Sequence, residues 1–339
     1  MSINWSHCPL VAQHEQARMW LTIQARLGLA ANTLDAYSRG LEDYFTVCQH
    51  HGIAILMAKR EHIALYVNNM AVRARPNGTT GLANATMQQR LTAVRLFYDY
   101  LVEEGLREKN PVGRGLYTPG RAFAGARERG LLPHYRKLPW IPNEEEWQRI
   151  LACAKTEGLR NRLMFALAYD SALRREELCS LETADIDPAH RLLHIRAETT
   201  KTRHARVVPY SVVTEDLLQH YLHERRKITR ERGALFRTLS PRNRGSAVSI
   251  WTWSKVIRSL ALRAEIPRFS THTLRHLCLT DLARANWDLH EIALFAGHHA
   301  LQTTLQYIHL SGRELGDKFA RTMAQLHGGR LEQLQQVWS

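Results

Sequence analysis

Apolar residues in the first 110 positions recur at spacings of three and four, the period of a helix with one buried face. One stripe runs over 34–48 and comprises Leu34, Tyr37, Leu41, Tyr44, Phe45 and Cys48. Asn32 or Thr33 is expected to cap its start, and Gly52 follows its end. A shorter pattern covers 60–73, and a third runs over 87–101 before Gly105. These stripes predict a small helical bundle over 1–112.

Residues 113–139 break the periodicity. The segment holds five glycines, three prolines and seven Lys, Arg or His side chains, with few regularly spaced apolar residues. Such a composition is typical of a linker, and its positive charge would suit a path along a DNA backbone or a solvated hinge equally well. We therefore expect two domains joined by a basic linker over 113–139.

Regular patterns return from Pro142 onward. Asn143 and Glu146 have the spacing of a capping box at the start of a helix. A second helix is expected at about 160–169, followed by β-like runs at 192–195 and 206–210 that are joined by a polar hairpin. Further helices are expected at about 213–226, 248–264, 273–285, 288–296 and 300–308. The segment 140–327 is thus predicted to be a mixed α/β domain, with 328–339 as a tail.

Composition and charge indicate the class of molecule that the protein binds. The chain has 339 residues, 46 Lys and Arg against 32 Asp and Glu, and a net charge of +14. A positive field of this size favours a polyanion. No apolar run approaches the length of a membrane span, and no signal peptide is expected at the N-terminus. The five scattered cysteines contain no CxxC pair, which indicates reduced thiols. Nucleic acid in the cytoplasm or nucleoid is the remaining partner.

Most of the candidate catalytic residues lie in the C-terminal part of the chain. HTLRH at 272–276 is followed by GHH at 297–299 and by Tyr307, nine residues after His298. Arg174 in ALRREEL and Lys201 in TTKTRHARVVPY precede them. Each motif alone is common on a solvated helix or in ordinary packing. The ordered set is what suits attack on a phosphodiester.

Strand cleavage by transesterification requires charge stabilisation, a nucleophile and two proton transfers. Arg174 and Arg275 can clamp the nonbridging oxygens, because guanidinium matches phosphate geometry. His272, on the helical face of Arg275, and His298 can donate to phosphate or relay a proton. The remaining two roles fall to Lys201, as general acid for the leaving 5′-oxygen, and to Tyr307, as nucleophile.

These motifs resemble the active site of the tyrosine recombinases, the phage integrase family. SALRREELCSL resembles the family's TGLRxxELxxL box, the hairpin from Lys201 to Pro209 its KGxxxRxVP element, and TTLQYIHL its TTxxYxH ending. The match is strong over about 143–312, whereas residues before 113 resemble the family's helical, SAM-like core-binding domain less specifically. The resemblance places Glu177 on an acidic buttressing position and His309 on the trailing histidine.

Four positions depart from the family pattern without removing a reactive group. Ala296 replaces leucine in LGH, and Thr202 replaces the hairpin glycine beside Lys201. His204 stands where a second lysine is common, and Asn286 replaces a glycine at a helix end. Asn tolerates the left-handed backbone that such a glycine adopts.

Other residues have supporting or weaker assignments. His276 and His309 are expected to be structural or to support the catalytic groups. The local excess of histidines lacks carboxylate or cysteine companions at ligand spacing, so no metal is expected. No GxxxxGK[ST] motif occurs, and no cofactor is expected. Weak DNA contacts are assigned to Arg73, Arg90, Arg95, Arg203 and Arg206.

The resemblance implies a mainly helical protein with a small β-sheet that clamps duplex DNA and recombines specific sites. It further implies a 3′-phosphotyrosyl intermediate, a four-way (Holliday) junction and a homotetramer on DNA. Few residues precede the first helix, which favours a compact Xer or Cre type, or a mobile-element enzyme, without an arm-binding domain. The apolar stripe at 331–338 would dock on its own domain or on a neighbouring protomer. Alternatives are a type IB topoisomerase, a telomere resolvase, or a catalytically silent DNA-binding protein.

Overall fold

The computed structural model describes residues 3–74, 78, 80–113, 131–132, 138–200 and 203–310, with side chains described as far as Tyr307. The chain divides into two compact units, Met1–Arg136 and Lys137–Ser339. Each unit has its own apolar core. The division falls within the predicted linker, and the linker residues Leu131 and Leu132 pack on the N-terminal core.

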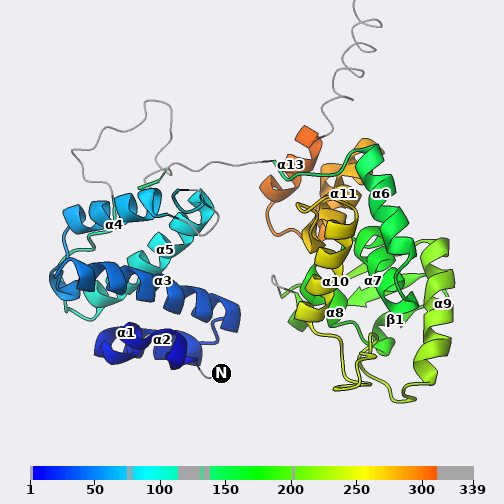
Figure 1. Ribbon diagram of the computed structural model, residues 1–339, viewed down its shortest axis with the longest axis horizontal. Helices are drawn as coiled ribbons and strands as arrows, with labels where there is room; N and C mark the ends of the chain where they lie inside the picture. Colours follow the sequence, from blue (N-terminus) through cyan, green and yellow to red (C-terminus); the bar gives the residue numbers. More distant parts are fainter. Residues whose placement is uncertain are drawn as a thin grey trace, which may run out of the picture. The chain divides into compact units, whose positions relative to one another are not determined.

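The N-terminal unit is built from helices (Figure 1). They are α1 (Pro9–Gln13), α2 (Glu15–Arg26), α3 (Ala31–His50), α4 (Arg60–Val72) and α5 (Asn84–Glu103). The long helices α3 and α5 lie side by side. They pack closely where Gly40 meets Ala93, because a Cβ on Gly40 would lie 3.2 Å from that of Ala93. The predicted stripes are the faces that α3 and α5 bury.

Two local expectations in this unit had different outcomes. Helix α3 begins earlier than predicted: its N-cap is Ala30, two or three residues before the expected caps, and no side chain caps it, so Asn32 and Thr33 lie inside the helix. The apolar contacts of α3 therefore set its start, rather than a capping side chain. Gly52 and Gly105 follow the ends of their helices, as predicted, and both adopt positive φ.

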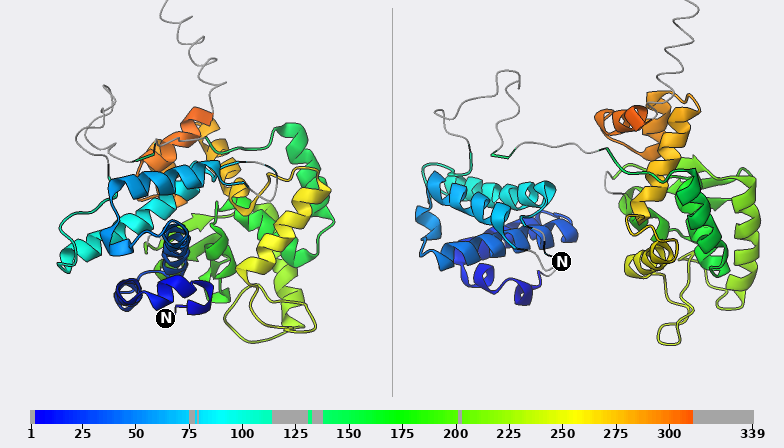
Figure 2. Two further views of the ribbon diagram at one scale, coloured as in Figure 1. Left: turned by 60° about the vertical axis from the view of Figure 1, so that its left-hand side comes forward. Right: turned by 45° about the horizontal axis from the view of Figure 1, so that its top comes forward.

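The C-terminal unit has a central helix, α7 (Leu159–Asp170), in contact with α6 (Glu144–Lys155), α8 (Arg175–Cys179), α9 (Val212–Arg226) and α11 (Thr271–Arg284). The remaining helices are α10 (Ile250–Arg263), α12 (Leu289–Ala296) and α13 (Gln302–Leu310). Asn143 and Glu146 form the predicted capping box of α6. Helices α11, α12 and α13 gather at one end of the unit (Figures 1 and 2).

The sheet is small and antiparallel, with strand order β1 (Ile186–Asp187), β2 (Leu192–Ile195) and β3 (Arg206–Pro209). Leu193 pairs with Val208, and both side chains are buried. Strands β2 and β3 were predicted, whereas the two-residue β1 is too short to give a sequence signal. The mainly helical fold with a small sheet is confirmed. No helix among the described residues is long and apolar enough to cross a bilayer.

Candidate active site

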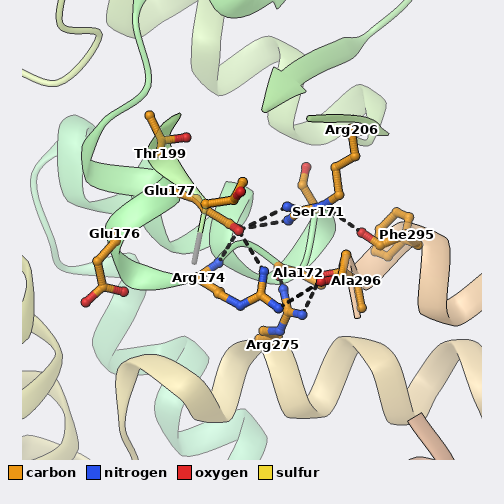
Figure 3. A network of polar contacts seen from close by, with 12 residues as sticks. Ser171, Ala172, Arg174, Glu176, Glu177, Thr199, Arg206, Arg275, Phe295 and Ala296 are labelled. Atoms are coloured by element: carbon orange, nitrogen blue, oxygen red, sulfur yellow. Dashed lines mark hydrogen bonds and ion pairs between the residues drawn. The ribbon is translucent and has the colours of Figure 1, made fainter. Parts of the chain in front are cut away.

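The site is organised around Glu177, whose side chain has no exposed surface. Arg174, the residue before α8, closes a capping box with it: Nη1 donates to Oε1 at 2.8 Å, and the main-chain amide donates to Oε2 at 2.9 Å. Arg206 on β3 donates both terminal nitrogens to the same carboxylate, at 3.0 and 2.8 Å (Figure 3). One buried carboxylate therefore holds two arginines that are 32 positions apart.

The turn after α12 contacts the network formed by Glu177, Arg174 and Arg206. Gly297 has φ of +64°, and a Cβ there would lie 3.1 Å from Nη1 of Arg206. Arg174 Nη2 donates to the carbonyl of Gly297, and Arg206 Nε donates to that of Phe295. Glycine at 297 is thus required both by the left-handed backbone and by the close approach of Arg206. The contacts bring the loop bearing His298 to the arginines.

Arg275 lies on α11 and is buried. Its Nη1 donates to the carbonyl of Ala172 at 2.6 Å, and its Nη2 donates to that of Ala296 at 2.5 Å (Figure 3). Burial and the neighbouring charge of Arg174 lower the pKa of Arg275 to about 10, which still leaves it protonated at neutral pH. Two main-chain carbonyls therefore orient a charged group that retains further N–H donors.

Tyr307 on α13 is almost fully buried, with 1% of its surface exposed. Its hydroxyl lies 2.9 Å from Nδ1 of His276. Its ring stacks on that of His298, with the two ring centroids 6.1 Å apart and an interplanar angle of 5°. His298 Nδ1 lies 2.9 Å from the hydroxyl of Thr304. Burial raises the pKa of Tyr307, whereas the charges of Arg275 and Arg174 lower it. The phenol thus lies within the field of both guanidinium groups.

The three histidines of the site are biased toward the neutral form. Burial and the charge of Arg275 lower the pKa of His298 to about 3. Burial and the neighbouring His272 lower that of His276 to about 4. Partial burial also lowers the pKa of His272, against the opposing charge of Glu176, although this residue keeps an exposed surface. Imidazoles in this state can accept as well as donate a hydrogen bond.

The predicted site residues Arg174, Glu177, His272, Arg275, His276, His298 and Tyr307 come together from α8, α11, the α12–α13 turn and α13. Lys201 lies outside the described residues, as does the side chain of His309. The hairpin approaches the site at its described edge, where Nε2 of His204 lies 3.3 Å from Nε2 of His299. Nothing in the spacing of these two histidines could have predicted their contact.

The arginines assigned as weak DNA contacts have different environments. Arg206 forms an ion pair with Glu177 and a hydrogen bond to the carbonyl of Phe295, and its side chain is only 8% exposed. This position argues against a contact with DNA. It indicates instead that Arg206 orients the neighbouring site residues. Arg73 and Arg90 both form ion pairs with Asp43. Arg95 and Arg203 have exposed side chains, as contact with a phosphate would require.

Three features of the site were missed in the sequence. The carbonyls of Ala172 and Ala296 orient Arg275, and the hydroxyl of Thr304 contacts His298. Main-chain carbonyls carry no sequence signal. The direct contact of His276 with Tyr307 was also missed, although its place one turn after His272 put both histidines on one helical face. Among the described residues, no cluster of three or more potential metal ligands occurs.

Glu177→Gln should destabilise the C-terminal unit in a pH-dependent way. Burial alone would raise the pKa of Glu177, but its bonds to Arg206 and Arg174 and their charges lower it from 4.5 to about 2. A lowered pKa means that the ion pairs stabilise the fold above about pH 4.5 and that this contribution is lost as the pH falls toward 2. The shift corresponds to about 3 kcal/mol. Urea unfolding at pH 3 to 7 measures it.

The free energy of unfolding of wild-type protein should exceed that of Glu177→Gln most at pH 6 to 7, and the difference should shrink toward pH 3. Glu176→Gln is the matched control, because Glu176 is a partly exposed neighbour on the same helix. A difference between wild type and Glu177→Gln that stays constant across this range would contradict the assigned ion pairs.

Fold and site together define a tyrosine recombinase. Residues 142–314 match the phage integrase family, and residues 19–105 match the phage integrase N-terminal SAM-like domain. The chain therefore belongs to the phage integrase family, since this match spans half of its length.

Curated relatives agree with this assignment. The chain is 30% identical over 305 residues to the tyrosine recombinase XerD of Caulobacter vibrioides, covering 84% of this chain and 88% of the relative. It is 28% identical over 308 residues to the tyrosine recombinase XerD of Rhizobium meliloti, covering 87% and 90%. Both likenesses extend across the two units.

Solved structures share the fold. XerH site-specific recombinase, bound to a palindromic difH substrate in a post-cleavage complex, aligns with a TM-score of 0.67 at 20% identity, covering 91% of this chain and 84% of that one. The Tn1549 transposon integrase in complex with transposon right end DNA aligns with a TM-score of 0.65 at 16% identity, covering 93% and 99%. At these identities the likeness extends to the fold alone.

Proposed function

We propose a route by which this tyrosine recombinase carries out site-specific DNA recombination. The hydroxyl of Tyr307 attacks a backbone phosphorus of duplex DNA. The bond between phosphorus and the 5′-oxygen breaks, and a 3′-phosphotyrosyl bond forms. The observation that carries this proposal is the burial of the Tyr307 phenol against two histidines and within the field of Arg174 and Arg275.

Arg174 and Arg275 stabilise the transition state. Charge builds on the nonbridging oxygens as the fifth bond to phosphorus forms, and preoriented guanidinium donors oppose it without reorganising. The Glu177 carboxylate and the carbonyls of Ala172 and Ala296 supply that orientation. His272 and His298 complete the phosphate-binding site as hydrogen-bond donors to the nonbridging oxygens.

Lys201 gives a proton to the leaving 5′-oxygen. The phosphotyrosyl bond keeps the energy of the cleaved phosphodiester, so rejoining to a 5′-hydroxyl of a partner strand requires no nucleotide cofactor. Attack by that hydroxyl reverses each proton transfer and releases Tyr307. Two such exchanges, with a Holliday junction between them, recombine the two sites.

Tyr307 is inaccessible to DNA in the resting protein, because a hydroxyl on a residue that is 1% exposed cannot reach an external phosphorus. DNA binding therefore has to shift α13 enough to open one side of the phenol. The contacts of α13 are with α11 and α12, so these two helices are the surfaces along which it moves.

The assembly follows from the same chemistry. Four active sites are needed to exchange two duplexes, which supports a homotetramer on DNA with the two units of each protomer clamping the duplex. The tail at 328–339 lies outside the described residues and is proposed to dock on its own or a neighbouring protomer. A cytoplasmic, nucleoid-associated protein of the compact Xer or Cre type, or one from a mobile element, fits these requirements.

A nicked substrate tests the proposal. A duplex site is first isolated from a random-sequence library by repeated binding to the protein, and a nick is placed so that cleavage releases a short fragment carrying the 5′-hydroxyl. Loss of that fragment prevents rejoining, so the covalent adduct should accumulate and remain on denaturing gels. Tight binding without an adduct at any nick position would contradict strand transfer and favour a silent DNA-binding protein.

A further inference from the structure

His276 is the described group best placed to take the proton of the nucleophile. It lies one turn beyond His272 on α11, and its Nδ1 is 2.9 Å from the hydroxyl of Tyr307 on α13. The two rings are inclined at 38° with centroids 5.7 Å apart, so the contact is made in part edge-on rather than by stacking. A hydrogen bond of this length is suited to proton transfer.

The other groups around the phenol are less suited to this role. His298 presents its ring face to Tyr307, and its Nδ1 is engaged with Thr304. Arg275 and Arg174 act on the phenol through charge, and a guanidinium has no acceptor atom. Gln306 also hydrogen-bonds the hydroxyl, but an amide does not take up a proton. Among the described residues, His276 alone combines a basic nitrogen with a hydrogen bond to this oxygen.

The surroundings of His276 link its basicity to DNA binding. Burial, then the charges of His272 and Arg275, lower the pKa of His276 to about 4, so its imidazole is neutral at neutral pH. A neutral ring with its proton on Nε2 leaves Nδ1 as an acceptor. The same charges would oppose proton uptake in the resting protein. A bound phosphate offsets them, because its negative charge favours the imidazolium form.

We propose that His276 is a catalytic residue that takes the phenolic proton of Tyr307 during cleavage. As the bond from the Tyr307 oxygen to phosphorus forms, the proton passes to Nδ1 of His276, while the bond to the 5′-oxygen breaks and Lys201 protonates that oxygen. In rejoining, His276 returns the proton to the departing phenolate. This inference rests on the proposed function and assigns its general base.

His276→Asn tests the assignment, because the Asn side chain can keep a hydrogen bond near the position of Nδ1 but cannot accept a proton. The rate of adduct formation on the nicked duplex should fall by about 10²-fold or more. DNA affinity and the thermal midpoint should stay close to those of wild type. His290→Asn is the matched control, since His290 is an exposed histidine on α12 outside the site, and its rate should be unchanged.

A duplex with sulfur in place of the scissile 5′-oxygen separates the base from the acid. A thiolate leaves without a proton, so Lys201→Ala should recover much of its rate on this substrate. His276→Asn should remain slow, because its defect concerns the attacking oxygen. If His276→Asn does not fold, His276→Gln undergoes the same comparison.

Three results would overturn the inference. An adduct formed at the wild-type rate would show that the hydrogen bond is dispensable, and a faster rate would mean that His276 only stores Tyr307. Recovery on the sulfur substrate would place His276 at the leaving group. Failure of the proposed function is distinguishable from all three, because wild-type protein would then form no adduct.

Discussion

Tyr307→Phe should abolish covalent attachment to DNA and leave DNA binding almost unchanged. The variant removes one oxygen from a buried ring that keeps its stacking on His298. The expected loss of adduct exceeds about 10⁴-fold, because the variant lacks the nucleophile of the first bond-forming step. Adduct formation on the nicked duplex measures it.

The matching measurement is DNA affinity at fixed salt, since backbone contacts make affinity strongly salt-dependent. Tyr221→Phe provides the control, because Tyr221 is another buried tyrosine of the same unit, on α9 and outside the site motifs, whose hydroxyl donates to the carbonyl of Leu235. It should form adduct at close to the wild-type rate. Adduct formation by Tyr307→Phe would show that a different residue is the nucleophile.

Arg275→Ala should reduce cleavage by about 10²- to 10³-fold, the usual effect of removing one preoriented donor from a developing negative charge. DNA binding should fall much less, because the donor acts mainly on the transition state. Arg174→Ala is expected to behave similarly, with the difference that Glu177 then loses one of its two arginine partners. Single-turnover cleavage at saturating protein separates the chemical step from binding.

Arg275→Lys is the informative companion variant. Lysine keeps the charge but cannot donate to Ala172 and Ala296 in the geometry of a planar guanidinium. Its rate should therefore remain far below wild type, even where folding is restored relative to Arg275→Ala. A lysine variant of full activity, or equal losses of binding and cleavage in the alanine variant, would contradict the transition-state role.

Much of this molecule could be predicted because its signals are local. The stripes of α3 and α5, the capping box of Asn143 and Glu146, and the positive φ of Asn286 each depend on a few neighbouring residues. The ordered motifs also named the residues that the fold brings together. Their order along the chain carried information that no single motif held.

What escaped prediction depends on tertiary contacts. Arg206 appeared to be a cation available to DNA, yet β3 delivers it to a carboxylate 29 positions away in the chain. Arg73 and Arg90 similarly converge on Asp43. The lowered pKa values of His276 and His298 arise from burial among arginines, which spacing alone does not reveal. The sequence shows which side chains are charged, but only the fold shows which groups they contact.

Mass spectrometry of the trapped adduct tests the central claim most directly. After nuclease and protease digestion, one peptide should carry a nucleotide through a 3′-phosphate on the hydroxyl of Tyr307, and fragmentation should place the added mass on that residue. An adduct on another side chain, or one joined through a 5′-phosphate, would contradict the account.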